Sequence, residues 1–177
     1  YRECVQEYDK QDTIDFQRYL GDRQQTVKMT LSLRHPLEQK EFVKLKPDRE
    51  TAENLSSVTD RQLAAIRRGL QGSLNHGPIL NYPVSDVHFG LHWLEVGRGT
   101  SDLVLASAAA SLAGQLFKNA SPALMEPMME VSVTVDEAFF SAVLTDLSNR
   151  RAKIQEIQQQ GELKSVLAVA PLSELVG

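Results

Sequence analysis

Two of the four histidines, His88 and His92, stand four residues apart, a spacing that brings two metal ligands together on a helix. The surrounding residues predict a strand instead, where four residues span about 13 Å, too far for one shared ion. Phe89, Leu91 and Trp93 are expected to point to the opposite face of that strand. The pattern therefore favours the polar face of a half-buried strand, and we predict no metal site.

Motifs for nucleotide binding and covalent catalysis are absent from the sequence. Gly97 and Gly99 flank Arg98, but the G-x-x-x-x-G-K-[ST] phosphate-binding loop needs a lysine that does not follow. No serine lies in a nucleophile elbow. The single cysteine, Cys4, excludes an internal disulfide and a cysteine-built metal site, and it fits a reducing compartment. We therefore predict no catalytic residue and no cofactor here, and no enzyme activity for these residues by themselves.

Clustered cations are the remaining candidates for chemistry, because basic side chains on rigid elements or loop tips bind RNA phosphates. Overall charge does not favour polyanions, since residues 1–122 hold 15 basic and 15 acidic residues, and residues 123–177 hold 4 and 8. Contacts with RNA would therefore depend on local patches and on shape. A merely solvated surface remains the alternative for each cluster. The clustered cations are Arg67, Arg68, Arg98, Arg150, Arg151 and Lys153.

The elements that position these side chains follow from hydrophobic periodicity. Residues 26–33 alternate apolar and polar side chains, which predicts a strand with one buried face, and residues 42–46 predict a second strand. Thr59 and Gln62 form a capping box that begins an amphipathic helix, with Gly77 as its C-terminal cap. Further expected elements are a polar connection at 47–57, a strand at 83–93, a turn at 96–99 and a helix at 103–118 capped by Ser101 or Thr100; residues 1–25 are polar and receive no element.

A Ser-Pro step at residues 121–122 is the predicted boundary to a second part of the chain. There, residues 130–135 alternate as a strand, Thr134 and Glu137 fit a capping box that opens a helix, and two strands surround a turn at 160–161. This is the βαββ order of an incomplete ferredoxin-like unit. Its first strand would be left as an apolar edge, so we expect the chain to be a piece of a longer protein.

Three segments of the sequence resemble the elongation factor G family of ribosomal translational GTPases. They are GPILNYPVSDV (77–87), LMEPMMEV with DLSNRRAKI (124–131 and 146–154) and PLSELVG (171–177), which cover most of residues 70–177 in the right order. The resemblance implies an α+β fold: residues 1–121 as the fourth domain, an arm of the ribosomal protein S5 domain 2 type, and residues 122–177 as a truncated, ferredoxin-like fifth domain.

The resemblance also implies which residues meet the ribosome. Two tip loops of the arm would enter the decoding region, and the fifth domain would contact ribosomal RNA. Both tips depart from translocating factors: the GGRGQYG loop has no counterpart, and Val96 replaces a functional histidine. The implied tip residues are Arg34, His35, Lys40, Val96, Gly97, Arg98 and Gly99, and the implied RNA contacts of the second domain are Arg150, Arg151 and Lys153.

These departures point to one branch of the family. Residues 12–33 and 148–158 resemble the mitochondrial ribosome-releasing branch. That branch implies disassembly of ribosomes with ribosome recycling factor after termination, in the mitochondrial matrix. The alternatives are an elongation factor G-type translocase, including one of the bacterial cytoplasm, and more remotely a small unrelated αβ enzyme. GTP and Mg²⁺ would be bound by a GTPase domain upstream of these residues. We expect a monomer. The sequence has no run of about 18 apolar residues, so it predicts no membrane span.

Overall fold

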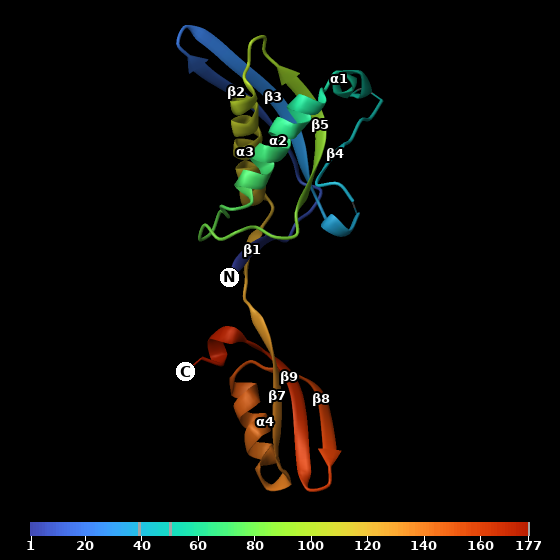
Figure 1. The fold of residues 1–177 in the computed structure, drawn as a ribbon, viewed down its shortest axis with the longest axis vertical. Coiled ribbons are helices and arrows are strands. Elements are labelled where there is room, and N and C mark those ends of the chain that lie inside the picture. Colours follow the sequence, from blue (N-terminus) through green and yellow to red (C-terminus); the bar gives the residue numbers. More distant parts are fainter. Residues whose placement is uncertain (39, 50, 177) are drawn as a thin grey trace. The chain divides into compact units, whose positions relative to one another are not determined.

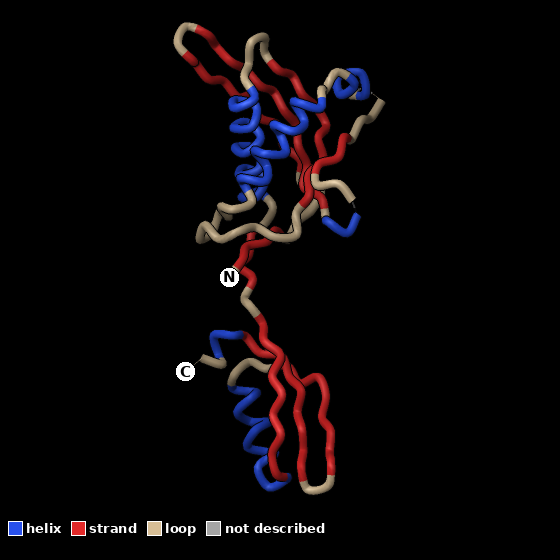
Figure 2. Tube along the Cα trace, viewed as in Figure 1, coloured by secondary structure: helices blue, strands red, loops and turns tan. Residues whose placement is uncertain are grey.

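The computed structural model describes residues 1–38, 40–49 and 51–176 of the 177. The chain forms two compact α+β units, Arg2–Met125 and Glu126–Gly177 (Figures 1 and 2). They divide a few residues later than the predicted boundary at 121–122, because β6 (Pro122–Met125) pairs antiparallel with β1 (Arg2–Val5). The Ser-Pro step therefore begins a strand of the first unit.

A four-stranded sheet in the order β2-β3-β5-β4 forms the floor of the first unit. β2, β3 and β5 are antiparallel, and β4 runs parallel to β5. The strand predicted at 26–33 is confirmed. β2 was not predicted: it is an edge strand whose apolar residues Ile14 and Phe16 are only half-buried, so its sequence is mostly polar. The strand predicted at 83–93 begins later than expected. The bounds are β2 (Gln11–Leu20), β3 (Arg23–Arg34), β4 (Val43–Leu45) and β5 (His88–Val96).

Two long helices, α2 (Asp60–Ser73) and α3 (Asp102–Asn119), cover one face of this sheet (Figure 1). The predicted capping box is confirmed: Thr59 Oγ1 accepts from the Gln62 amide at 3.2 Å, and Gln62 Oε1 accepts from the Thr59 amide at 3.0 Å. Ser101 caps α3 through the Val104 amide. The segment predicted as a polar connection contains a short helix, α1 (Ala52–Ser56).

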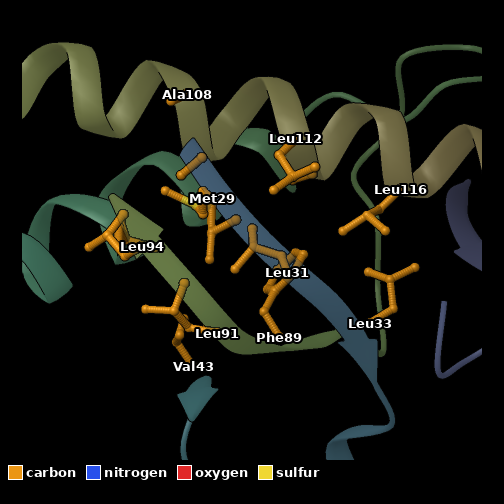
Figure 3. Close-up of a cluster of buried hydrophobic side chains, with 14 of the residues drawn as sticks. Met29, Leu31, Leu33, Val43, Phe89, Leu91, Leu94, Ala108, Leu112 and Leu116 are labelled. Carbon is orange, nitrogen blue, oxygen red and sulfur yellow. The ribbon is translucent and has the colours of Figure 1, made fainter. Parts of the chain in front are cut away.

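The core of the first unit lies between the sheet and these helices (Figure 3). Every second residue of β3 faces inward, and α3 contributes alanines and leucines that let its backbone lie close to the sheet. Gly69 of α2 lies so close to the Ala106 carbonyl of α3 that a Cβ there would collide with it. The labelled core residues are Met29, Leu31, Leu33, Val43, Phe89, Leu91, Leu94, Ala108, Leu112 and Leu116.

A β-bulge in β5 overturns one expectation about which residues share a face. Leu31 pairs with Leu91, but the preceding residue, Thr30, pairs with Trp93, so His92 is an extra residue in the ladder. The alternation therefore shifts by one, and Leu94, rather than Trp93, enters the core.

Gly77 is not the cap of α2, which ends at Ser73. Instead it begins a loop that wraps the fully buried carboxylate of Glu3. That carboxylate accepts hydrogen bonds from three amides of the loop: Ile79 at 2.6 Å, Leu80 at 3.2 Å and Tyr82 at 2.8 Å. A Cβ on Gly77 would overlap the carboxylate, so only glycine fits there.

The second unit has the predicted βαββ order, with a three-stranded antiparallel sheet in the order β7-β9-β8. Leu147 of its helix packs on Val166 and Ala168. The capping box predicted at residues 134–137 is wrong, because β7 continues to Asp136 and Thr134 bonds Ser165 across the sheet at 3.0 Å. A single 3₁₀ turn then leads into the helix. The bounds are β7 (Met128–Asp136), α4 (Phe140–Asn149), β8 (Lys153–Gln160) and β9 (Leu163–Pro171).

Candidate nucleic-acid interface

The two loops that the resemblance implies as tips begin at opposite ends of the first unit's sheet. β3 and β5 are antiparallel, with Val27 opposite Val96 and Arg34 opposite His88. Residues 34–38 therefore follow the far end of β3, while residues 96–99 lie beside its beginning. The two loops that the resemblance implies as tips are therefore separated by the length of β3.

The turn between β2 and β3 takes the place of the expected first tip loop. The two strands pair without interruption as far as Leu20 and Arg23, and Gly21 makes the turn with a φ of +62°. This hairpin lies at the same end of the sheet as the loop from β5 to α3 (Figure 1).

Hydrogen bonds fix the β5–α3 loop to the beginning of β3. The Gly97 amide donates to the Thr26 carbonyl at 2.8 Å, and the Ser101 amide donates to Gln25 Oε1 at 2.9 Å. Gly97 leaves room for the Thr26 side chain, so its role is structural. Of the predicted residues 96–99, Arg98 and Gly99 are exposed at the turn, where Gly99 has a φ of +78°.

Exposed side chains of both turns make up a surface that we call the hairpin tip. Tyr19 is 72% exposed and Leu20 is 56% exposed. Sequence reasoning missed all of these except Arg98, although the Gly-Asp pair between two alternating stretches is a hairpin signal. An aromatic ring among guanidinium groups has the chemistry of an RNA contact, since rings stack on bases and guanidiniums bind phosphates. The hairpin tip comprises Arg18, Tyr19, Leu20, Arg23 and Arg98.

The other predicted loop is held by contacts within its own unit. Arg34 pairs with Asp9 at 3.0 Å, and the His35 ring packs edge-on against Tyr8 with centroids 4.9 Å apart. Lys40 is exposed. Of the three predicted residues, Lys40 is thus the exposed one, whereas Arg34 and His35 are half-buried.

Arg151 in the second unit forms ion pairs within that unit. Its guanidinium donates to both carboxylate oxygens of Glu126 at 3.2 Å and to Glu174 Oε1 at 3.1 Å. Its backbone has a φ of +54°. The hydrogen bonds that it donates to Glu126 and then to Glu174 raise the pKa of Arg151 above its already high value. The residue therefore ties the start of the unit to its end.

Arg150 is engaged in a similar way, whereas Lys153 is not. Arg150 bonds Asp146 at 2.9 Å, four residues back in α4, and the carbonyl of Glu174 at 2.6 Å. Lys153 begins β8 with an exposed side chain, opposite Val169. Arg151 and Lys153 are thus exposed, and Arg150 is half-buried.

Within the described residues, no three His, Cys, Asp or Glu side chains lie close enough together to hold a metal ion. His92 bonds Ser32 Oγ at 2.8 Å, and His88 packs edge-on against Phe42. In the same part of the chain, no helix is long and apolar enough to cross a membrane.

Comparison with known proteins places these features in a family. The model of the elongation factor G C-terminus matches residues 123–177. Two proteins named "Ribosome-releasing factor 2, mitochondrial" are each 33% identical over 166 residues: that of Drosophila virilis, over 93% of this chain, and that of Mus musculus, over 94%. The chain belongs to the elongation factor G family.

The chain corresponds to only part of the length of these family members. It spans 23% of the length of the Drosophila virilis protein and 21% of that of the mouse protein. A crystal structure of a Thermus thermophilus protein matches 98% of this chain and 25% of that chain, with a TM-score of 0.78 and 22% identity. That likeness shows the fold, in agreement with the α+β class predicted from the sequence.

Proposed function

We propose that these residues are the ribosome-engaging part of a translational GTPase that acts in ribosome disassembly, together with ribosome recycling factor, after termination. The observation that carries the proposal is the hairpin tip, where Arg18, Tyr19 and Arg23 are exposed on the β2–β3 hairpin and Arg98 is exposed in the loop at the same end of the sheet. The name of the similar proteins, ribosome-releasing factor 2, mitochondrial, supports a ribosome-releasing role and a mitochondrial location, for which we propose the matrix.

The chain would act by shape and contact rather than by covalent chemistry. The sheet, with α2 and α3 on one face, gives the hairpin a stiff base. GTP and Mg²⁺ would be bound elsewhere in the full-length protein, and the present residues would pass on the resulting movement to the ribosome as a monomer. Arg150, Arg151 and Lys153 would add contacts with ribosomal RNA from the second unit.

The test is a ribosome-splitting assay with the full-length protein and ribosome recycling factor. Replacing Arg18, Tyr19 and Arg23 together by alanine should slow splitting about tenfold or more, since about 1.4 kcal/mol of lost contact is a factor of ten. The matched control is Lys118→Ala, which removes an exposed cation near the other end of α3 and should leave splitting unchanged.

Two results would count against the proposal. Unchanged splitting in the triple variant would remove the hairpin tip from the function. Efficient single-round translocation by the unmodified protein, without splitting, would assign the chain to the translocase alternative. At the position expected for a functional histidine of translocating factors, this chain has Val96, half-buried against the core.

A further inference from the structure

Helix α4 of the second unit ends in a left-handed cap, and an arginine occupies its strained position. The Ala152 amide donates to the Leu147 carbonyl at 3.0 Å, and the Arg151 amide donates to the Ser148 carbonyl at 3.2 Å, the two bonds of a Schellman cap. Arg151 has the positive φ of +54° that such a cap requires and that glycine adopts most readily. A residue with a side chain persists in this conformation where other contacts hold it.

The contacts that hold Arg151 come from two segments far from it in sequence. Glu126, at the entry to the second unit, accepts from both terminal nitrogens of the guanidinium at 3.2 Å. Glu174, in the 3₁₀ turn Leu172–Glu174 that follows β9, accepts from its Nε at 3.1 Å. Arg150 adds a bond of 2.6 Å to the Glu174 carbonyl. The cap of one helix thus holds both the entry segment and the turn after β9.

The entry segment and the turn after β9 also meet through their backbones. The Leu172 amide donates to the Pro127 carbonyl at 2.9 Å. This bond lies just beyond the pair of Met128 with Pro171, so it is the last rung of the β7–β9 ladder. The end of a ladder is where a sheet opens most easily. The side chain of Arg151 binds the residues next to this rung on both strands, Glu126 and Glu174, and so is placed to keep it closed.

We propose that Arg151 is a two-state latch on the entry to the second unit. In the closed state its backbone is left-handed, its guanidinium holds Glu126 and Glu174, and the rung between Pro127 and Leu172 is formed. In the open state the backbone returns to an ordinary conformation, both carboxylates are released, and the entry segment separates from the turn after β9. Strain in the cap favours opening, and the ion pairs favour closing. The latch uses no residue of the hairpin tip and does not depend on the proposed function.

Amide hydrogen exchange of the 177-residue chain, followed by NMR, measures the latch at the Leu172 amide. Arg151→Gly removes the ion pairs and also relieves the backbone strain. Exchange at Leu172 should therefore rise about fivefold, the effect of two exposed ion pairs, while the Ala152 amide in the cap stays protected. Arg151→Ala removes the ion pairs and keeps the strain, so both amides should exchange faster. In the unmodified chain, about 1 M NaCl should speed exchange at Leu172, since it screens charges beyond about 3 Å.

Two controls separate the latch from a general loss of stability. Lys153→Ala removes an exposed cation that forms no ion pair within the described residues, so exchange at Leu172 should not change. The amide of Val166, which is buried in β9, reports on unfolding of the whole unit and should keep its rate in Arg151→Gly. Unchanged exchange at Leu172 in Arg151→Gly would overturn the proposal. So would an equal rise at Val166, or equal protection of Ala152 in the two Arg151 variants.

Discussion

At the scale of single residues, the buried carboxylate of Glu3 links two distant segments of the first unit. It joins β1 to a loop more than seventy positions away and gives three amides the acceptor that burial would otherwise deny them. The family-like segment that contains Gly77 and Tyr82 therefore has a structural explanation. It is the binding loop for an internal anion.

Glu3→Gln is expected to lower the free energy of unfolding by about 2–3 kcal/mol. The amide keeps the size of the side chain, but it removes the charge and turns one acceptor into a donor that faces N–H groups. Urea unfolding measures the change. The control is Glu7→Gln, which breaks only an exposed pair with Lys10 at 3.4 Å and should cost less than about 1 kcal/mol. Equal losses in the two variants would contradict this account of Glu3.

At the scale of elements, the packing of α2 on α3 depends on a missing side chain. Gly69 brings the two helices together at the Ala106 carbonyl. Gly72 lies in the same helix, one turn on, with nothing within 4 Å of where its Cβ would be. The two glycines thus have the same helical backbone and opposite surroundings.

Alanine at these two positions should change stability in opposite directions. Gly69→Ala forces the helices apart and should destabilise the chain by about 1–3 kcal/mol. Gly72→Ala gains helix propensity without a clash and should stabilise it by about 0.5–1 kcal/mol. Thermal unfolding of both variants, compared with the unmodified chain, is the measurement. A stable Gly69→Ala would mean that the helices do not meet as closely as described.

At the scale of the whole molecule, the first unit closes on itself only after β6. This strand follows α3 and returns to pair with β1, from Val5 opposite Pro122 to Arg2 opposite Met125. The beginning and the end of the unit therefore hold each other, and the pairing includes the backbone on both sides of Glu3. A division at residues 121–122 would cut through this sheet.

Two fragments of the chain test where the first unit ends. Residues 1–125 should unfold cooperatively, at a clearly higher temperature than residues 1–121, because the shorter fragment leaves β1 without its partner and exposes its backbone groups. Circular dichroism during heating compares them. Identical midpoints would show that β6 contributes nothing and would favour the earlier boundary.

The sequence by itself determined the features that depend on neighbours along the chain. The strand at residues 26–33, the capping box at Thr59 and the βαββ order after residue 125 all follow from periods of two or 3.6 residues and from caps within a few positions. Such signals act through local backbone geometry, so they can be recognised without knowing the fold. The capping box expected at residues 134–137 failed because cross-strand pairing to β9 extended β7 through it.

Only the tertiary structure decided which distant residues meet. The hairpin tip, the open-face position of Trp93 and the wrapping of Glu3 depend on strand register and on contacts between segments far apart in sequence. A one-residue bulge reverses which side chains face the core, and no local pattern around His92 announces it. The two loops implied as tips were assigned by resemblance alone, and the antiparallel pairing of β3 with β5 places them at opposite ends of the sheet. Register is set by the packing of the whole sheet, and for that reason the short-range pattern could not supply it.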